Sequence, residues 1–500
     1  MFSRSKHPLL TGAVLLTAAG ILSRVIGFFY RIFLSRTIGA QGLGIYQMIF
    51  PVYAFFFSLT AAGIQSAISR CCASARSERN PQKEWAFFLT GTCFCVGSSC
   101  LAALFLHRYA SWISVTLLNE SRCCDLLKLL AFSLPFGSLH ACISAWYYSS
   151  RHSFVPAFSQ LLEQVTRVGT SYLIYLIFLE QHKTPTPLLA VSGILAGELA
   201  ACLFCLLALA FHTVPSKLFP IFSFSVCFRE LLTLSFPLTI NRILVNFFQS
   251  TEAILIPGRL KLFGMDHASA LSLYGSLTGM ALPFILFPTA ITSSFSTLLL
   301  PSIAGQQAAG QQKAIRISTE RTIKYCLQLG ILAGGIFFFF GEDLSQLLYQ
   351  NKDAGMFLRI LAFLCPFLYL GNTLTGILTG LGHTFLCLLQ NLLGLGIRIL
   401  FVFFVIPQVG ILGYLWGLLI SQLISTGCSL FILHRSVDYS FSPSVCILKP
   451  CISLFLSCGI GLLCYHLLAF LLLPQLFSLG GSIAVSGGLF FLFLVLWHAI

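Results

Sequence analysis

Long apolar segments separated by short polar connections follow one another along the whole chain. Two of them, residues 331–340 and 467–473, contain no charged residue. A helix that crosses a bilayer needs roughly 20 mostly apolar residues, because the hydrocarbon core is about 30 Å thick. The apolar residues are continuous and do not alternate with polar ones, which favours helices over the strands of a closed barrel. The pattern therefore predicts an all-α polytopic membrane protein.

The same pattern predicts about fourteen transmembrane helices. The expected spans are residues 9–34, 43–69, 86–107, 126–149, 155–179, 187–211, 230–256, 271–300, 322–341, 356–380, 384–406, 411–434, 447–470 and 481–499. Arg4 and Lys6 precede the first span, as they would in a signal peptide. The apolar segment continues past Arg24, so we expect this span to remain part of the fold.

The second half of the chain repeats the first. Residues 130–167 align without a gap on residues 361–398, with 11 identities in 38 positions that include Arg167 with Arg398. Weaker matches join Arg24 to Arg242, Leu43 to Leu271, Tyr46 to Tyr274, Gly193 to Gly413 and Gly197 to Gly417. Self-similarity of this kind indicates a duplicated structural unit.

The duplication predicts three parts of the chain. Residues 1–215 and 216–436 are expected to form two six-helix lobes, related by an axis along the membrane normal. Residues 437–500 are expected to add two transmembrane helices outside the repeat.

The charged residues do not change the prediction of a polytopic membrane protein. Only 9% of the 500 residues are charged, against about 25% in soluble domains. The formal charge of +14 does not require a nucleic-acid partner, because basic residues accumulate on cytoplasmic loops. With the N-terminus inside, 15 of the 29 basic residues fall on the cytoplasmic side and 8 on the outer side. We therefore expect both termini in the cytoplasm.

The sequence offers no motif for enzymatic chemistry. It contains no GxxxxGK[ST] phosphate-binding loop, no HExxH and no aspartate-rich cluster. Many of the 19 cysteines lie inside apolar segments, and the Cys202-x-x-Cys205 pair has no second pair nearby. These cysteines are better explained as helix-packing residues than as metal or redox ligands. We expect no catalytic residue, no metal and no cofactor.

Charged residues within the expected spans mark the candidate sites, since a charge at the bilayer centre costs roughly 2.5–3.5 kcal/mol or more. They are Arg24, Arg31, Glu163, Arg167, Glu198, Arg242, Glu252, Arg359 and Arg398.

Three of the arginines predict an anion site. Arg24 and Arg31 are seven residues apart and share a helix face, and Arg242 is the repeat partner of Arg24. If they face a central cavity, their guanidinium groups suit a diphosphate. Arg31 has an alternative role, in which it extends to the outer interface. Asn241 and Gln249 are assigned to the same polar interior, although such residues also join helices.

The remaining charges are candidates for ion coupling or ion pairing. Glu163 and Arg167 are spaced for an intrahelical ion pair, which lowers the cost of burying both. Arg398 repeats Arg167, but a glycine stands where the acid would be, so Arg398 needs another partner or a ligand. Glu198 and Glu252 are interpreted as proton or sodium sites, or as structural partners of arginines.

The first 70 residues carry a specific motif. The pattern SRxxGFxYRxxL begins at Ser23, GxxGLGxYQ begins at Gly39, and Pro51 follows. It resembles the stage V sporulation protein B and polysaccharide-export family, which is similar to MurJ-type lipid II flippases within the multidrug/oligosaccharidyl-lipid/polysaccharide superfamily.

The resemblance implies two six-helix bundles in a V shape that flip undecaprenyl-diphosphate-linked sugars by alternating access. It implies a location in the bacterial cytoplasmic membrane, and a groove for the lipid tail beside the last two spans. It also implies a cavity lined by arginines on spans 1, 2 and 8. Arg24 matches the first of these, while Arg31 lies one place later than in MurJ-type members. Spans 2 and 8 carry no clear arginine.

The leading hypothesis is a flippase for a lipid-diphosphate-linked oligosaccharide, such as a peptidoglycan or spore-cortex precursor. Its expected partners are this glycan, membrane lipid and a coupling cation, either sodium or a proton, and we expect a monomer. The alternative is a cation-coupled multidrug exporter of the same fold, which predicts acids at the cavity centre. A membrane-embedded transferase would need an acidic metal-binding cluster or an outer catalytic set, and neither is visible in the sequence. A non-transporting scaffold would require that both lobes have lost their cavity, which the retained Arg24 and Arg242 argue against.

Overall fold

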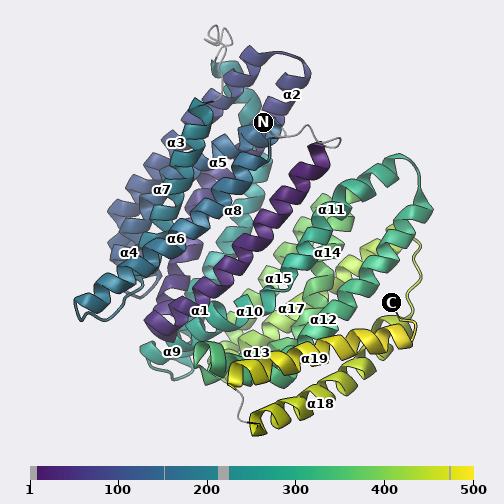
Figure 1. The fold of residues 1–500 in the computed structure, drawn as a ribbon. Coiled ribbons are helices and arrows are strands. Elements are labelled where there is room, and N and C mark those ends of the chain that lie inside the picture. The colour runs from purple at the N-terminus through teal and green to yellow at the C-terminus, as the bar shows by residue number, and fades with distance from the viewer. Residues whose placement is uncertain (1–7, 151, 212–223, 472–473, 500) are drawn as a thin grey trace. The chain divides into compact units, whose positions relative to one another are not determined.

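The computed structural model describes residues 1–500 except 1–7, 151, 212–223, 472–473 and 500. Within the described residues the chain is helical throughout and contains no strand, which confirms the predicted fold class (Figure 1). The chain divides into two compact units, Met1–Ile254 and Leu255–Ile500. The division falls inside helix α8 (Phe224–Leu262), so that each unit contains a part of this helix.

In the described residues of the first unit there are seven complete helices and the first part of α8. These are α1 (Pro8–Phe57), α2 (Gly63–Ser77), α3 (Pro81–Trp112), α4 (Cys123–Ala131), α5 (Ser133–Ser149), α6 (Phe154–Glu180) and α7 (Leu188–Ala210), with π-helical turns at Ser58–Ala62 and Ile113–Leu117. Helix α1 is kinked at Gly39, which has φ 68° and ψ −179°. Glycine adopts this left-handed conformation without the Cβ clash of other residues, and the kink separates the first two expected spans.

The second unit holds the end of α8 and the helices that follow it. These are α9 (His267–Gly275), α10 (Leu282–Leu286), α11 (Thr289–Ala308), α12 (Gln312–Tyr349), α13 (Lys352–Leu361), α14 (Cys365–Gly380), α15 (Thr384–Phe404), α16 (Ile406–Val409), α17 (Ile411–Ser436), α18 (Lys449–Phe470) and α19 (Gln475–Leu496). The last two pack against each other and against α12. Gln328 of α12 donates a hydrogen bond to the Ala499 carbonyl at 2.9 Å, which holds the end of the chain in place.

Twelve helical segments of the described residues are long and apolar enough to cross a membrane. The first, Leu15–Ser77, is 63 residues long and covers most of the first expected span and all of the second. Helix α6 is not one of the twelve, and it carries Glu163 and Arg167 in place of apolar residues. The protein is a multi-pass membrane protein, while the count of fourteen spans stays a prediction.

Several local features recur where the sequence repeat places them. A break at Phe132 separates α4 from α5, and a short 3-10 turn at Ala362–Leu364 separates α13 from α14. Gly197 lies against α6, and its repeat partner Gly417 lies against Phe401 of α15. The duplication and the expected boundaries at 215 and 436 remain predictions, because the compact units divide at residue 254.

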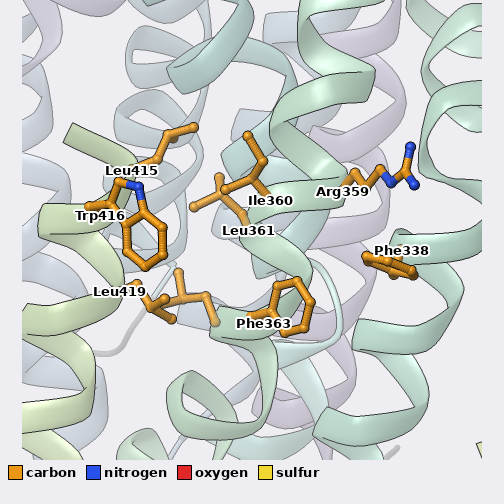
Figure 2. Close-up of a pocket in the computed structure, with 9 residues that line it drawn as sticks. Phe338, Arg359, Ile360, Leu361, Phe363, Leu415, Trp416 and Leu419 are labelled. Carbon is orange, nitrogen blue, oxygen red and sulfur yellow. The ribbon is translucent and has the colours of Figure 1, made fainter. Parts of the chain in front are cut away.

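Arg359, one of the charges expected within a span, lies at an apolar pocket of the second unit (Figure 2). Its guanidinium pairs with Glu342 at 3.2 Å and stands 5.2 Å from the centre of the Phe338 ring. Both side chains of the ion pair are more than half exposed. The pocket has a volume of about 300 Å³ and is also lined by Phe363 and Trp416. Arg359 therefore lies at an exposed position and does not belong to a polar interior.

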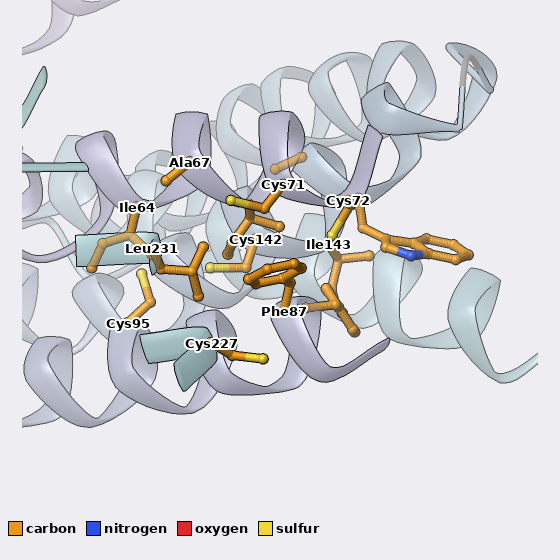
Figure 3. Close-up of a cluster of buried hydrophobic side chains, with 14 of the residues drawn as sticks. Ile64, Ala67, Cys71, Cys72, Phe87, Cys95, Cys142, Ile143, Cys227 and Leu231 are labelled. Atoms are coloured by element: carbon orange, nitrogen blue, oxygen red, sulfur yellow. The ribbon is translucent and has the colours of Figure 1, made fainter. Parts of the chain in front are cut away.

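Buried thiols fill much of the apolar core of the first unit (Figure 3). The core includes Cys71, Cys72, Cys95, Cys142, Cys205 and Cys227. The Cys95 thiol donates a hydrogen bond to the Thr60 carbonyl at 3.3 Å, across from α3 to the turn after α1. Within the described part of the chain every cysteine is a free thiol, as expected for small helix-packing residues.

The glycines of α7 allow it to approach α6 closely, and this predicts the effect of adding a methyl group. A Cβ on Gly197 would stand 2.8 Å from the Glu163 carbonyl oxygen, so the two helices would have to separate. We expect Gly197→Ala to destabilise the protein by about 1–3 kcal/mol, measured as a lower apparent melting temperature in detergent.

Gly169→Ala on α6 is the matched control. A Cβ at Gly169 would meet nothing within 4 Å, and alanine is the better helix former by about 1 kcal/mol. Equal melting temperatures for the two variants would contradict the close-approach explanation.

Candidate functional site

A cluster of charged side chains lies inside the first unit, where α5, α6 and α7 meet. It consists of His140 from α5, Glu163 and Arg167 from α6, and Glu198 from α7. Each of the four side chains is only 14–16% exposed. Charges buried to this extent within apolar helices need partners, and the structure provides them.

Two glycines of α7 position the cluster. A Cβ on Gly193 would stand 2.7 Å from the Arg167 carbonyl oxygen, and a Cβ on Gly197 would stand 2.8 Å from the Glu163 carbonyl oxygen. Since no side chain intervenes at these two turns, α7 packs directly on the backbone of α6. Glu198, the residue after Gly197, is thereby brought to the same level as Glu163.

The charges are matched in pairs. Arg167 donates to the Glu163 carboxylate, in the i,i+4 ion pair that the sequence spacing predicts. Nδ1 of His140 lies 3.5 Å from Oε2 of Glu198, and Nε2 lies 3.0 Å from the Ser159 hydroxyl. The charges of the two acids are therefore opposed by a guanidinium and an imidazole.

Hydrogen bonding fixes the orientation of the His140 ring. The Ser159 hydroxyl donates to the Pro156 carbonyl at 3.0 Å, so its oxygen accepts a hydrogen bond from Nε2–H of His140. The same ring therefore contacts α6 through Nε2 and faces Glu198 of α7 with Nδ1.

A pocket of about 320 Å³ opens on this cluster. His140, Glu163 and Glu198 line it together with Gly137, Ser144 and Gln160. The ring of Phe57, from α1, and that of Tyr148, from α5, also border it. This volume is at the lower end of the roughly 300–1,000 Å³ of small-molecule sites.

The cluster could also be considered as a cation site. One ligand atom each from His140, Glu163 and Glu198 lies within 4.8 Å of the others. The guanidinium of Arg167 already occupies Glu163, however, and its positive charge opposes a metal ion in the same place. The residues therefore fit a metal poorly.

The structure places the five residues expected at the anion site within the first unit. Arg24 on α1 is exposed and Arg31 is partly buried. On α8, Arg242 and Gln249 are exposed and Asn241 is partly buried. Arg242 was expected in the second lobe, and it lies in the same compact unit as Arg24.

Polar side chains attach the first part of α8 to the end of α1. Asn246 donates to the Ala54 carbonyl at 3.3 Å and to the Ser58 hydroxyl. Ser250 donates to the Pro51 carbonyl at 3.0 Å. Asn246 lies one helical turn after Arg242, so these bonds fix the part of α8 that carries the arginine.

Glu252 and Arg398 are the other two candidate coupling residues. Glu252, on α8, is 5% exposed, and Arg398, on α15 of the second unit, is partly buried. The glycine that replaces the acid beside Arg398 is Gly394, where a Cβ would stand 2.7 Å from the Ser425 hydroxyl. The packing of α15 against α17 therefore leaves little room for an acid at this position.

Sequence reasoning did not identify His140 or Ser144. Each is a polar residue of α5, and no charged candidate residue lies three or four positions away from it in the sequence. Their significance depends on α6 and α7, which supply Glu163 and Glu198. The signal that could have drawn attention to them is their own spacing of four residues, which places both on one face of the helix.

Comparison with solved structures first shows which group of proteins shares this fold. The chain is similar in structure to "Lipid II flippase MurJ, inward closed conformation", with a TM-score of 0.74 and 15% identity, over 97% of this chain and 99% of that one. It is also similar to an inward-facing multidrug resistance MATE family transporter of the MOP superfamily, with a TM-score of 0.63 and 12% identity, over 85% and 98%. The fold is therefore that of this group of membrane proteins.

The sequence then defines the family. The family described as "Polysaccharide biosynthesis protein" matches residues 9–306, and the chain belongs to it. The MatE family also matches residues 237–404. Stage V sporulation protein B of Bacillus subtilis (strain 168) is 28% identical over 82% of this chain and 80% of its own length. Lipid II flippase MurJ of the same organism is 21% identical over 67% and 66%.

Breaking the buried ion pair tests how strongly the cluster depends on charge matching. Glu163→Gln leaves the Arg167 guanidinium without its anionic partner in a largely buried place. Removal of one partner of a buried pair costs about 3–5 kcal/mol. We therefore expect a large drop in the apparent melting temperature of the purified protein.

Asp125→Asn is the control for this experiment. Asp125 pairs with Lys128 at 3.5 Å, but the two side chains are 87% and 41% exposed. Exposed pairs contribute about 0–1 kcal/mol, so this variant should melt close to the wild type. If Glu163→Gln has the same melting temperature as Asp125→Asn, the buried pair does not stabilise the unit.

Proposed function

We propose that this protein is a flippase that moves a lipid-diphosphate-linked oligosaccharide across the bacterial cytoplasmic membrane by alternating access. The glycan is a peptidoglycan or spore-cortex precursor. The observation that carries the proposal is the pair of exposed arginines, Arg24 and Arg242, on two apolar membrane helices of one unit. The similarity to stage V sporulation protein B and to a lipid II flippase supports it.

The arginines bind the diphosphate in this proposal. A guanidinium within a membrane helix is costly unless it faces protein or a polar ligand, and its planar donors match phosphate oxygens in pairs. Arg24 and Arg242 supply the charge, with Arg31 as a third donor on the face of α1 that carries Arg24. Asn241 and Gln249 on α8 add amide hydrogen bonds.

A membrane potential or a cation gradient supplies the energy, since the sequence contains no nucleotide phosphate-binding loop. The acids proposed for coupling to sodium or a proton are Glu198, which faces His140, and the buried Glu252. The paired Glu163 and Arg167 serve the structure in this scheme. The transporter acts as a monomer with both termini in the cytoplasm.

The second candidate function is cation-coupled export of organic cations. Two observations favour it: the MatE match to residues 237–404, and the two carboxylates that face the pocket of the first unit. The ion pair of Glu163 with Arg167 weighs against it, because it removes one of the two negative charges that a cationic drug would need.

Substitution of the two arginines tests the flippase proposal. The purified protein is reconstituted into vesicles with a fluorescent lipid-diphosphate-linked glycan, and the rate of flipping is measured. Hydrogen bonds to charged groups are worth about 1.5–3 kcal/mol, which is tenfold or more in affinity. We expect Arg24→Ala and Arg242→Ala each to lower flipping by about tenfold or more.

Two further variants sharpen the test. Arg24→Lys keeps the charge but loses the paired donors, so it should also lose activity if the site is bidentate. Arg108→Ala removes an exposed arginine of α3 outside the proposed site and should flip normally. Normal flipping by folded Arg24→Ala and Arg242→Ala would exclude the diphosphate site. Transport of an organic cation instead of the glycan would favour the exporter.

A further inference from the structure

The pocket of the first unit contains polar groups that its own structure does not use. Ser144 lines the pocket, is only 5% exposed, and its hydroxyl has no hydrogen-bond partner among the described residues. The Tyr53 hydroxyl, which lies beside Gly137 of the pocket wall, also has no hydrogen-bond partner among the described residues. A buried hydroxyl without a partner costs roughly 1–3 kcal/mol, so a ligand that satisfies it gains affinity.

These groups converge on one place. A Cβ on Gly137 would stand 3.2 Å from Oε2 of Glu198 and 3.3 Å from the Tyr53 hydroxyl. Gly137 itself lines the pocket, so the space beside it is bounded by a carboxylate and a phenol at contact distance. The absence of a side chain at Gly137 is what keeps this part of the pocket open.

The acids of the pocket already have partners. The titratable side chains that line the pocket are His140, Tyr148, Glu163 and Glu198. Arg167 pairs with Glu163, and the His140 ring lies 3.5 Å from the Glu198 carboxylate. A ligand with many hydroxyl groups can donate to the carboxylates and accept from the serine and tyrosine hydroxyls without bringing charge of its own.

The walls of the pocket suit a sugar ring. Gln65 and Gln160 line it with carboxamides, each of which can donate and accept hydrogen bonds at adjacent ligand hydroxyls. Phe57 and Tyr148 border it with aromatic rings, against which the carbon–hydrogen face of a pyranose can pack. With a volume of about 320 Å³, the pocket accommodates a small ligand and not a long chain.

We propose that this pocket binds one sugar residue of the lipid-linked glycan, apart from the arginines that bind its diphosphate. This inference rests on the proposed function. It also changes one assignment within it, because Glu198 becomes a glycan-binding residue and Glu252 remains the acid for coupling. Tyr148 and Pro156 flank the connection between α5 and α6, which is the cytoplasmic end in the proposed orientation. A pocket at that end receives the glycan on the side where the precursor is made.

Two lipids separate sugar binding from diphosphate binding. Affinity is measured with the reconstituted full chain for undecaprenyl diphosphate alone and for undecaprenyl diphosphate carrying one N-acetylated hexosamine. Ser144→Ala removes a hydroxyl that makes no internal hydrogen bond, so the fold should be unaffected. We expect Ser144→Ala and Gln160→Leu each to weaken binding of the glycosylated lipid by about five- to tenfold, with no change for the lipid without sugar.

Ser138→Ala is the matched control. Ser138 is also a fully buried serine of α5 without a hydrogen-bond partner among the described residues, but it does not line the pocket. This variant should bind both lipids like the wild type. Unchanged binding of the glycosylated lipid by Ser144→Ala and Gln160→Leu would overturn the sugar site.

Other outcomes distinguish this inference from the proposed function. If the wild type binds neither lipid, the flippase proposal itself fails. If the wild type binds both lipids equally well and the pocket variants do the same, only the sugar site fails. A wild-type melting temperature that rises with sodium chloride but not with potassium chloride, and loses this rise in Glu198→Gln, would show a cation in the pocket and overturn the sugar site.

Discussion

The close packing of α6 on α7 is the constraint on which the polar interior of the first unit depends. Gly193 and Gly197 allow α7 to rest on the backbone of α6 at the turns that carry Arg167 and Glu163. At this separation Glu198 reaches the same polar pocket as Glu163. A side chain at either glycine would move the helices apart. The buried charges would then lose the partners that offset the free-energy cost of burying them.

Charge matching gives this interior its chemical character. A lone charge buried within the membrane costs free energy, so charged residues there usually pair with one another or face a water-filled cavity. Here Glu163 is held by Arg167, and Glu198 faces the imidazole of His140. The result is a pocket rich in hydrogen-bond donors and acceptors whose acids already have partners. Such a pocket suits the hydroxyl groups of the proposed carbohydrate ligand.

In the proposed function, the two sets of polar residues bind chemically different parts of the substrate. Exposed arginines on α1 and α8 offer the paired donors that a diphosphate requires. The pocket between α5, α6 and α7 offers carboxylates, amides and hydroxyls. Asn246 and Ser250 fasten α8 to the end of α1, so both sets belong to one compact unit. A single unit could thereby hold the charged and uncharged parts of one lipid-linked glycan.

The sequence by itself determined the helical membrane fold, because continuous apolar segments admit no other backbone in lipid. It also indicated the Glu163–Arg167 pair, since an i,i+4 spacing is a local property of one helix. The tertiary structure decided the rest. His140 and Ser144 acquired a role only when α6 and α7 packed beside α5, and Arg242 joined the unit of Arg24 through contacts 188 and 199 residues apart in sequence. Contacts between distant helices depend on where small residues permit close approach, which hydrophobic periodicity does not record.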